Sequence, residues 1–203
     1  MNDPIEQARR LLAIAQTGLH FAKDKFDQQR YREIEQMAHD QLGQMADLPG
    51  EQVAKLFAHE TGYANPKLDV RCAVFNEQGQ VLLVREAAEG LWSLPGGWAD
   101  IGSTPAECAA REVLEESGYR VRITRLLAVW DMRKHPHDPQ LFHIWKLVFA
   151  GEILEAGEGD GLETDGVGFF ALDALPALST GRILPQQLRQ LAELHELGGT
   201  VFD

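Results

Sequence analysis

Apolar residues in the first third of the chain recur at intervals of three and four positions, a spacing that places them on one face of a helix. The first run follows Asp3 and Pro4, which suit a helix N-cap and first turn. Its apolar positions are Ile5, Ala8, Leu11, Leu12, Ala15 and Leu19. Similar spacing predicts a second helix over about residues 27–46 and a short third helix near residues 51–60. We therefore predict an all-helical domain over residues 1–65.

From residue 66 onward the pattern changes to short apolar runs separated by turn residues, which is typical of strands. Two of these runs, 68–75 and 81–85, flank a short turn and predict a β-hairpin. The other strand-like runs are 119–130, 142–149 and 167–171, and a closing helix is predicted over 185–197. The acidic, glycine-rich segment 151–166 is expected to be a flexible loop. The chain is therefore predicted to be α+β, with the mixed domain over residues 66–203.

The predicted helical domain has a thin core of its own, because three helices in about sixty residues bury little apolar surface. Its apolar stripes must pack against something else. We expect a homodimer through these helices, together with packing on the following domain. A substrate-binding cap is the alternative. Tyr31, Met37 and Met45 lie at helical spacing, which favours packing over ligand contacts.

Residues 95–119 combine a glycine-rich turn with a predicted helix that is dense in carboxylates. Ser103 or Thr104 can cap the start of that helix, and Pro105 suits its first turn. Gly118 stands where a helix usually ends. The turn and the helix are thus expected to form one unit.

Glu112, Glu115 and Glu116 are spaced i, i+3, i+4 and therefore crowd one patch of this helix. Carboxylates placed there repel one another and face the negative end of the helix dipole. Two interpretations fit the pattern. The patch is a solvated acidic face with Arg111 as its partner, or it binds a hard cation such as Mg²⁺ or Mn²⁺ that would bridge to phosphate oxygens.

The residues from Gly97 to Tyr119 resemble the Nudix box, G-x5-E-x7-R-E-U-x-E-E-x-G-U, in which U is a bulky aliphatic or aromatic residue. Every fixed position matches except one, where Ser103 replaces a glutamate. In the family that glutamate pairs with the box arginine. In its absence we expect Asp100 or Glu107 to pair with Arg111.

The surrounding sequence looks like one branch of the Nudix family, the ADP-ribose and CDP-choline pyrophosphatases with an N-terminal domain named for hydrolases of X-linked nucleoside diphosphates. The stretches that carry this resemblance are DVRCAVF, LLVRE, LWSLPGGWADIGSTP and DMRKHPH, together with the helical start of the chain. The Ser-Thr-Pro of the third stretch is similar to the branch's own variant of the box. The resemblance covers nearly the whole chain and implies a Nudix α/β/α sandwich with a mixed sheet.

The resemblance also implies a reaction. A small nucleoside diphosphate derivative, such as ADP-ribose or CDP-choline, would be hydrolysed to a nucleoside monophosphate and a phosphorylated X with Mg²⁺ or Mn²⁺ as cofactor. The main metal ligands would be Glu112 and Glu116, with Glu115 on the same cluster and the backbone carbonyl of Gly96 beside them.

A general base and phosphate-binding side chains complete the expected site. The base would be a box glutamate or a residue of the acidic loop, for which the candidates in order are Glu163, Asp160 and Glu158. Basic side chains are expected to contact the phosphates, because guanidinium forks match phosphate oxygens. The candidates are Arg71, Arg85, Arg133 and Lys134.

Composition limits the other partners. The 203-residue chain has 31 acidic and 19 basic residues and a formal net charge of −12, which disfavours binding to duplex nucleic acid. Its two cysteines, Cys72 and Cys108, lack metal-ligand spacing. The first residues lack the features of a secretory signal, and no apolar run approaches the length of a membrane span. We expect a soluble cytoplasmic protein.

Three other functions stay open at the level of sequence. The same box serves hydrolases that act on nucleoside triphosphates or on RNA 5′ ends. A Nudix-like regulator would bind a nucleotide without cleaving it, although retention of all the box glutamates argues against this. The helical start of the chain is also compatible with a scaffold role.

Overall fold

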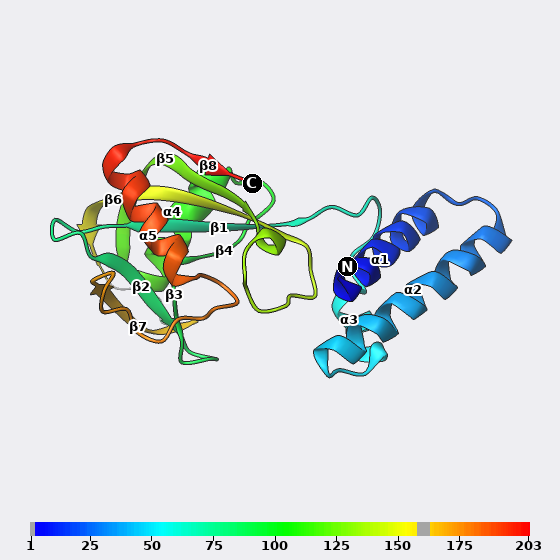
Figure 1. The fold of residues 1–203 in the computed structure, drawn as a ribbon. Helices are drawn as coiled ribbons and strands as arrows, with labels where there is room; N and C mark the ends of the chain where they lie inside the picture. Colours follow the sequence, from blue (N-terminus) through cyan, green and yellow to red (C-terminus); the bar gives the residue numbers. More distant parts are fainter. Residues whose placement is uncertain (1–2, 158–162) are drawn as a thin grey trace. The chain divides into compact units, whose positions relative to one another are not determined.

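The computed structural model describes residues 3–157 and 163–203. The chain forms two compact units (Figure 1). One contains the residues through Pro66 together with Gln140–His143, and the other contains Lys67–Pro139 and Ile144–Asp203. Each unit has a hydrophobic core of its own.

The first unit consists of helices α1 (Pro4–Phe21), α2 (Lys25–Ala46) and α3 (Gly50–Phe57). Figure 1 shows α1 and α2 side by side as a helical hairpin. The core residues are Ala8, Leu12, Ala38, Leu42 and Val53. Helix α2 begins earlier than residue 27 because the Asp24 carboxylate accepts the N–H groups of Phe26 and Asp27.

A short segment from far along the chain belongs to this helical unit. Leu141 packs against its core, and the Leu141 carbonyl accepts from Arg9 Nε at 3.2 Å. The ring of Phe142 lies 4.5 Å from that of Phe57. Local periodicity does not predict this return, since the contact joins segments that are distant in sequence.

Within the described residues the second unit contains two sheets, one in the order β4-β1-β6-β5-β8 and one in the order β3-β2-β7. The strands are β1 (Lys67–Val74), β2 (Val81–Glu86), β3 (Trp92–Ser93), β4 (Gly96–Trp98), β5 (Tyr119–Asp131), β6 (Ile144–Ala156), β7 (Thr164–Phe170) and β8 (Val201–Phe202). Strand β1 runs parallel to β6 and antiparallel to β4, so the larger sheet is mixed, as predicted.

Helices α4 (Pro105–Ser117) and α5 (Pro185–Leu197) pack on different core clusters. Ala109 and Val113 of α4 join one cluster, and Leu188 and Leu191 of α5 join the other. Figure 1 shows the two helices covering different faces of the strands. The α/β/α arrangement expected from the resemblance is confirmed.

The predicted hairpin between residues 68–75 and 81–85 is wrong. β1 pairs with β4 and β6 in the larger sheet, whereas β2 pairs with β3 and β7 in the smaller one. A single antiparallel bridge, Phe75↔Val81, joins the ends of the two runs. Both strands are buried over most of their length, so each finds partners on both sides, and the turn only redirects the chain from one sheet to the other.

The predicted loop over residues 151–166 is also partly wrong. β6 continues through Ala156 and stays paired with β5, from Gly151↔Ile123 to Ala156↔Tyr119. The long partner strand supplies backbone hydrogen bonds that the acidic, glycine-rich composition does not predict. Strand β7 begins at Thr164, within the predicted loop.

Two further observations concern the chain as a whole. Both cysteines are free and buried. Among residues 3–157 and 163–203, no helix has both the length and the apolar character needed to cross a membrane.

Candidate active site

The glycine turn lies directly on β1. Gly96 pairs with Arg71 and has a φ of +143°, a value that favours glycine. A Cβ atom at Gly96 would lie 2.1 Å from the Val70 carbonyl oxygen. Only glycine therefore allows this close approach of the two backbones.

Helix α4 follows the turn and is capped at both ends. Thr104 and Glu107 form a capping box, and Gly118 ends the helix with a φ of +77°. Because Glu107 is engaged in the cap, the box arginine pairs elsewhere: Arg111 Nη1 lies 2.7 Å from Asp100 Oδ2. The prediction that Asp100 replaces the missing glutamate as partner is confirmed, and the alternative, Glu107, is not the partner.

Glu116 lies under the glycine turn and is 7% exposed. Its Oε2 accepts the Gly96 N–H at 3.0 Å, and its backbone carbonyl accepts from Thr164 Oγ1 at 2.8 Å. Burial raises the pKa of Glu116 to about 8, against the opposing effects of Arg71 and the Gly96 N–H, while the negative charges of Glu86 and Glu112 raise it further. A cation bound beside this carboxylate would therefore favour its charged form.

Glu112 lies against Gly97, the next residue of the turn. A Cβ atom built on Gly97 would be 3.1 Å from Glu112 Oε2. Burial raises the pKa of Glu112, Arg111 and Arg71 lower it, and the charges of Glu115 and Glu163 raise it. The predicted base Glu163 is therefore near enough to act electrostatically on Glu112.

The other candidates for the metal site and the base are placed differently. Glu115 has a side chain that is 47% exposed and lies 3.9 Å from Arg111 Nε. Glu163 is exposed, and its carbonyl accepts the Ala87 N–H at 2.9 Å. The remaining base candidates, Glu158 and Asp160, lie outside the described residues.

The predicted three-glutamate cluster is not assembled in these side-chain positions. Over the described ranges, no three or more His, Cys, Asp or Glu side chains lie together in a way that could hold a metal ion. Glu115 is drawn toward Arg111, and Glu116 is hydrogen-bonded to the turn. The available donors nevertheless fit a hard cation such as Mg²⁺ or Mn²⁺, since they are carboxylate and carbonyl oxygens in a half-buried, negatively charged setting.

Of the predicted phosphate-binding residues, Arg71 is the one whose charge acts on both Glu112 and Glu116. It is only 4% exposed, and its guanidinium donates to Asp69 Oδ1 at 2.8 Å and to the Leu94 carbonyl at 2.9 Å. The structure therefore places Arg71 beneath the turn, and its contact with phosphate stays a prediction.

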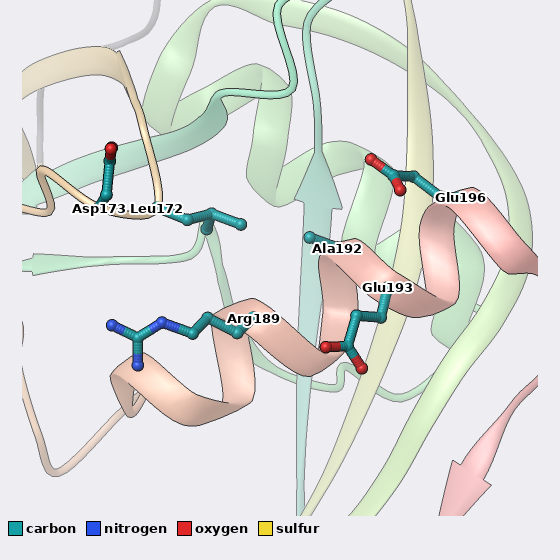
Figure 2. Close-up of a pocket in the computed structure, with 6 residues that line it drawn as sticks. All are labelled: Leu172, Asp173, Arg189, Ala192, Glu193 and Glu196. Atoms are coloured by element: carbon teal, nitrogen blue, oxygen red, sulfur yellow. The ribbon is translucent and has the colours of Figure 1, made fainter.

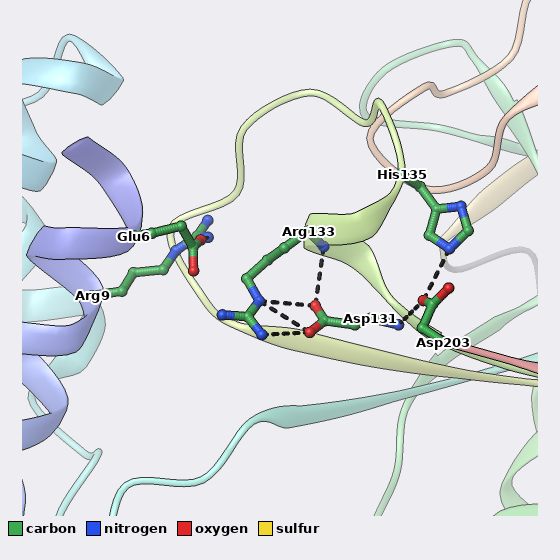
Figure 3. A network of polar contacts seen from close by, with 6 residues as sticks. All are labelled: Glu6, Arg9, Asp131, Arg133, His135 and Asp203. Carbon is green, nitrogen blue, oxygen red and sulfur yellow. Dashed lines mark hydrogen bonds and ion pairs between the residues drawn. The ribbon is translucent and has the colours of Figure 1, made fainter. Parts of the chain in front are cut away.

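The other basic candidates lie on separate elements. Arg85, on β2, pairs with Asp165 at 2.7 Å and is partly exposed. Figure 3 shows Arg133, in the 3₁₀ turn η1 (Met132–Lys134), donating to both carboxylate oxygens of Asp131. Lys134 is exposed. Phosphate contacts by these residues likewise stay predictions.

Several charged residues around the site were missed by the sequence interpretation. Glu86 is buried, accepts from Ser93 Oγ at 3.0 Å and lies 3.5 Å from Arg182 Nη2. Lys146 is fully buried and lies 2.9 Å from Asp69 Oδ2. A lysine inside the apolar run IWKLVFA was the available signal, because lysine is almost never fully buried unless it is paired.

A shallow pocket on the second unit contains none of the predicted site residues. Figure 2 shows the side chains that line it, which come from α5 and from the segment after β7. They are Leu172, Asp173, Arg189, Ala192, Glu193 and Glu196. The candidate site is therefore the region of α4 and the glycine turn.

Two family models match the chain. One, described as the NUDIX domain, matches residues 65–191, and the other, described as a UDP-X-like, N-terminal oligomerisation domain, matches residues 2–57. The first covers more than half of the chain, so the protein belongs to the Nudix family and is a hydrolase of that family. Nudix hydrolases generally use divalent metal ions.

Individual relatives agree with this assignment. The chain is 43% identical over 201 residues to a Bacillus subtilis (strain 168) protein named "Putative ADP-ribose pyrophosphatase YjhB", covering 98% of this chain and 96% of that protein. The crystal structure of a UDP-X diphosphatase is 33% identical with a TM-score of 0.64, covering 98% of this chain and 96% of that one. An ADP-ribose pyrophosphatase from Streptococcus suis 89-1591 is 36% identical with a TM-score of 0.62, covering 68% of this chain and 100% of that one.

Proposed function

We propose that the protein hydrolyses the pyrophosphate bond of a nucleoside diphosphate linked to another moiety, such as ADP-ribose, CDP-choline or a UDP-X compound, to a nucleoside monophosphate and a phosphorylated X. One observation carries the proposal. A buried carboxylate, Glu116, and a half-buried one, Glu112, both with raised pKa values, lie against a glycine turn next to the Arg71 guanidinium. The names of the relatives support this substrate class.

We assign the residues as follows. Glu112, Glu116 and the Gly96 carbonyl would hold Mg²⁺ or Mn²⁺, and Glu115 would join them by turning away from Arg111. When bound, the ion neutralises phosphate oxygens and lowers the pKa of the attacking water. Glu163 would take the proton from that water at its carboxylate, which its exposure and its effect on Glu112 support.

The phosphates also need positive charge from the protein. We assign this role to Arg85, Arg133 and Lys134, whose side chains are partly or fully exposed. Arg71 would contribute through its field on Glu112 and Glu116, and through any phosphate oxygen that reaches beneath the turn.

The test is a substrate panel. Metal-free protein is incubated with Mg²⁺ or Mn²⁺ and with ADP-ribose, CDP-choline, UDP-sugars, nucleoside triphosphates and 5′-triphosphate RNA. We expect release of a nucleoside monophosphate and phosphorylated X only when a divalent ion is present. Release of pyrophosphate from triphosphates alone would support the alternative enzyme function. Tight binding of a nucleotide without turnover would support a regulator.

We propose that the helical unit forms a homodimer. The description of the matching family model as an oligomerisation domain supports this. So does a stripe on α1 that leaves Leu11, Ile14 and Phe21 exposed at 37%, 40% and 64%. Exposed apolar residues that gather on one face of a helix are typical of an interface.

A charge placed in this stripe should separate the subunits. Ile14→Glu is expected to convert the dimer to a monomer, because an unpaired carboxylate in an apolar interface is strongly unfavourable. Gln16→Glu adds the same charge on the same helix, turned away from the stripe, and should leave the dimer intact. Light scattering coupled to gel filtration distinguishes them. A dimer that persists in Ile14→Glu would place the interface elsewhere.

We also propose a cytoplasmic location. The two cysteines are free and buried, which suits a reducing compartment. Thiol titration of Cys72 and Cys108 in protein purified under denaturing, alkylating conditions would test this: two alkylated thiols are expected, and a disulfide would contradict it.

A further inference from the structure

Lys146 is fully buried on β6, yet none of the assigned steps uses it. Its ammonium nitrogen lies 2.9 Å from Asp69 Oδ2 and also donates to the carbonyl of Arg182. Removing an ammonium from water is strongly unfavourable, and a buried ion pair is often no more stabilising than apolar residues of similar shape. Stability alone is therefore a poor explanation for a lysine at this position.

The ion pair continues across neighbouring strands toward the site. The parallel register of β6 and β1 sets Lys146 beside Asp69, and the register of β1 and β4 sets Arg71 opposite Gly96. Asp69 Oδ1 accepts from Arg71 Nε at 2.8 Å, and Arg71 Nη1 donates to the Leu94 carbonyl at 2.9 Å. Charge-assisted bonds thus link Lys146 to the backbone just before the glycine turn.

The glycine turn is hydrogen-bonded both to Glu116 and to β1. The Gly96 N–H donates to Glu116 Oε2 at 3.0 Å, and the Cys72 N–H donates to the Pro95 carbonyl at 3.0 Å. Gly96 and Gly97 have no side chains with which to anchor themselves. A shift of Arg71 would therefore move the backbone of the turn. It would also move the Glu116 carboxylate, because that carboxylate accepts the Gly96 N–H.

We propose that Lys146 is a positioning residue of the active site. By holding Asp69 it keeps Arg71 against the glycine turn, and so fixes the geometry in which Gly96 and Glu116 meet a divalent ion. This proposal rests on the proposed function, in which Gly96 and Glu116 are metal ligands. It assigns Lys146 no contact with substrate or metal.

The test measures Mn²⁺ binding directly, by electron paramagnetic resonance titration of metal-free, full-length protein. An acidic surface also binds Mn²⁺ weakly, so Glu116→Gln serves as the reference. The Mn²⁺ that binds to wild type and not to this variant is the ion of the site. Lys146→Met keeps an unbranched side chain that is one heavy atom shorter and removes the charge. We expect this variant to bind the site-specific Mn²⁺ about 10- to 100-fold more weakly, the range typical of outer-shell partners.

A matched control separates positioning from stability. Leu191→Ala creates a cavity at a fully buried residue of α5 that takes no part in the ion pairs joining Asp69 to Arg71 and Lys146. It should lower the thermal midpoint and leave the Mn²⁺ affinity unchanged. A folded Lys146→Met protein that binds Mn²⁺ with wild-type affinity would overturn the proposal.

Asp69→Asn provides an independent variant should Lys146→Met fail to fold. It is expected to weaken Mn²⁺ binding in the same way, and unchanged affinity would also overturn the proposal. If Lys146 acts through Asp69, the double variant binds Mn²⁺ no more weakly than Asp69→Asn alone, whereas additive losses contradict that route. Wild-type protein without a Glu116-dependent Mn²⁺ site would remove the proposed function itself, a result distinct from unchanged binding in the variants.

Discussion

Glu116→Gln is expected to lower kcat about 1,000-fold, a loss of about 4 kcal/mol of transition-state stabilisation. The reason is that Glu116 is the most deeply buried box carboxylate, and an amide supplies no negative charge to a divalent ion. Steady-state kinetics with the best substrate of the panel and saturating Mg²⁺ measures the effect.

The fold of this variant should be retained. A glutamine has nearly the size of a glutamate, and its side-chain oxygen can still accept the Gly96 N–H that Glu116 accepts at 3.0 Å. Circular dichroism and thermal unfolding check this. Glu115→Gln is the matched variant on the same helix, and its partial exposure leads us to expect a loss of only about 10-fold. Turnover close to wild type in Glu116→Gln would contradict the metal assignment.

Gly96→Ala is expected to lower both activity and stability. A Cβ atom there would lie 2.1 Å from the Val70 carbonyl and 2.8 Å from the Arg71 Cα, so the turn must move off β1. We expect the free energy of unfolding to fall by about 3 kcal/mol. Because a displacement of about 1 Å in an active site can lower the rate 100-fold, kcat should fall by about that factor.

Gly79→Ala is the control for backbone strain without crowding. Gly79 has a φ of +71°, and a Cβ atom there would meet nothing within 4 Å. The strain alone should lower the free energy of unfolding by about 1 kcal/mol and leave kcat unchanged. Urea unfolding and initial rates for both variants give the comparison. Equal effects at the two glycines would show that the contact with β1 is unimportant.

The turn and helix of the box could be predicted closely from the sequence, because their determinants are local. Thr104 and Gly118 cap α4 at the positions where the pattern puts its ends. The i, i+3, i+4 spacing of the glutamates places them on one patch of any helix. The partner of Arg111 was also among the two alternatives considered, since Asp100 is close in sequence.

Strand pairing could be predicted less well. The runs that became β1 and β2 are close in sequence and separated by a turn, which favours a hairpin, yet they belong to different sheets. Residues 151–156 read as a loop, yet pairing with β5 makes them the end of β6. In both cases deciding hydrogen bonds come from strands distant in the chain: β6 for β1, β7 for β2, and β5 for residues 151–156.

The sequence by itself determined the helices, the family and the carboxylate-bearing element of the site, since spacing along one helix and the residues of one turn are read from neighbours in the chain. Only the tertiary structure decided which groups surround that element. It set Asp69 between Lys146 and Arg71, brought Thr164 to the carbonyl of Glu116, and buried Arg71 beneath the turn. The physical reason is strand register, because the pairing of backbones decides which side chains meet across a sheet. Burial then shifts the pKa values of those side chains. Local periodicity encodes neither the register nor the burial.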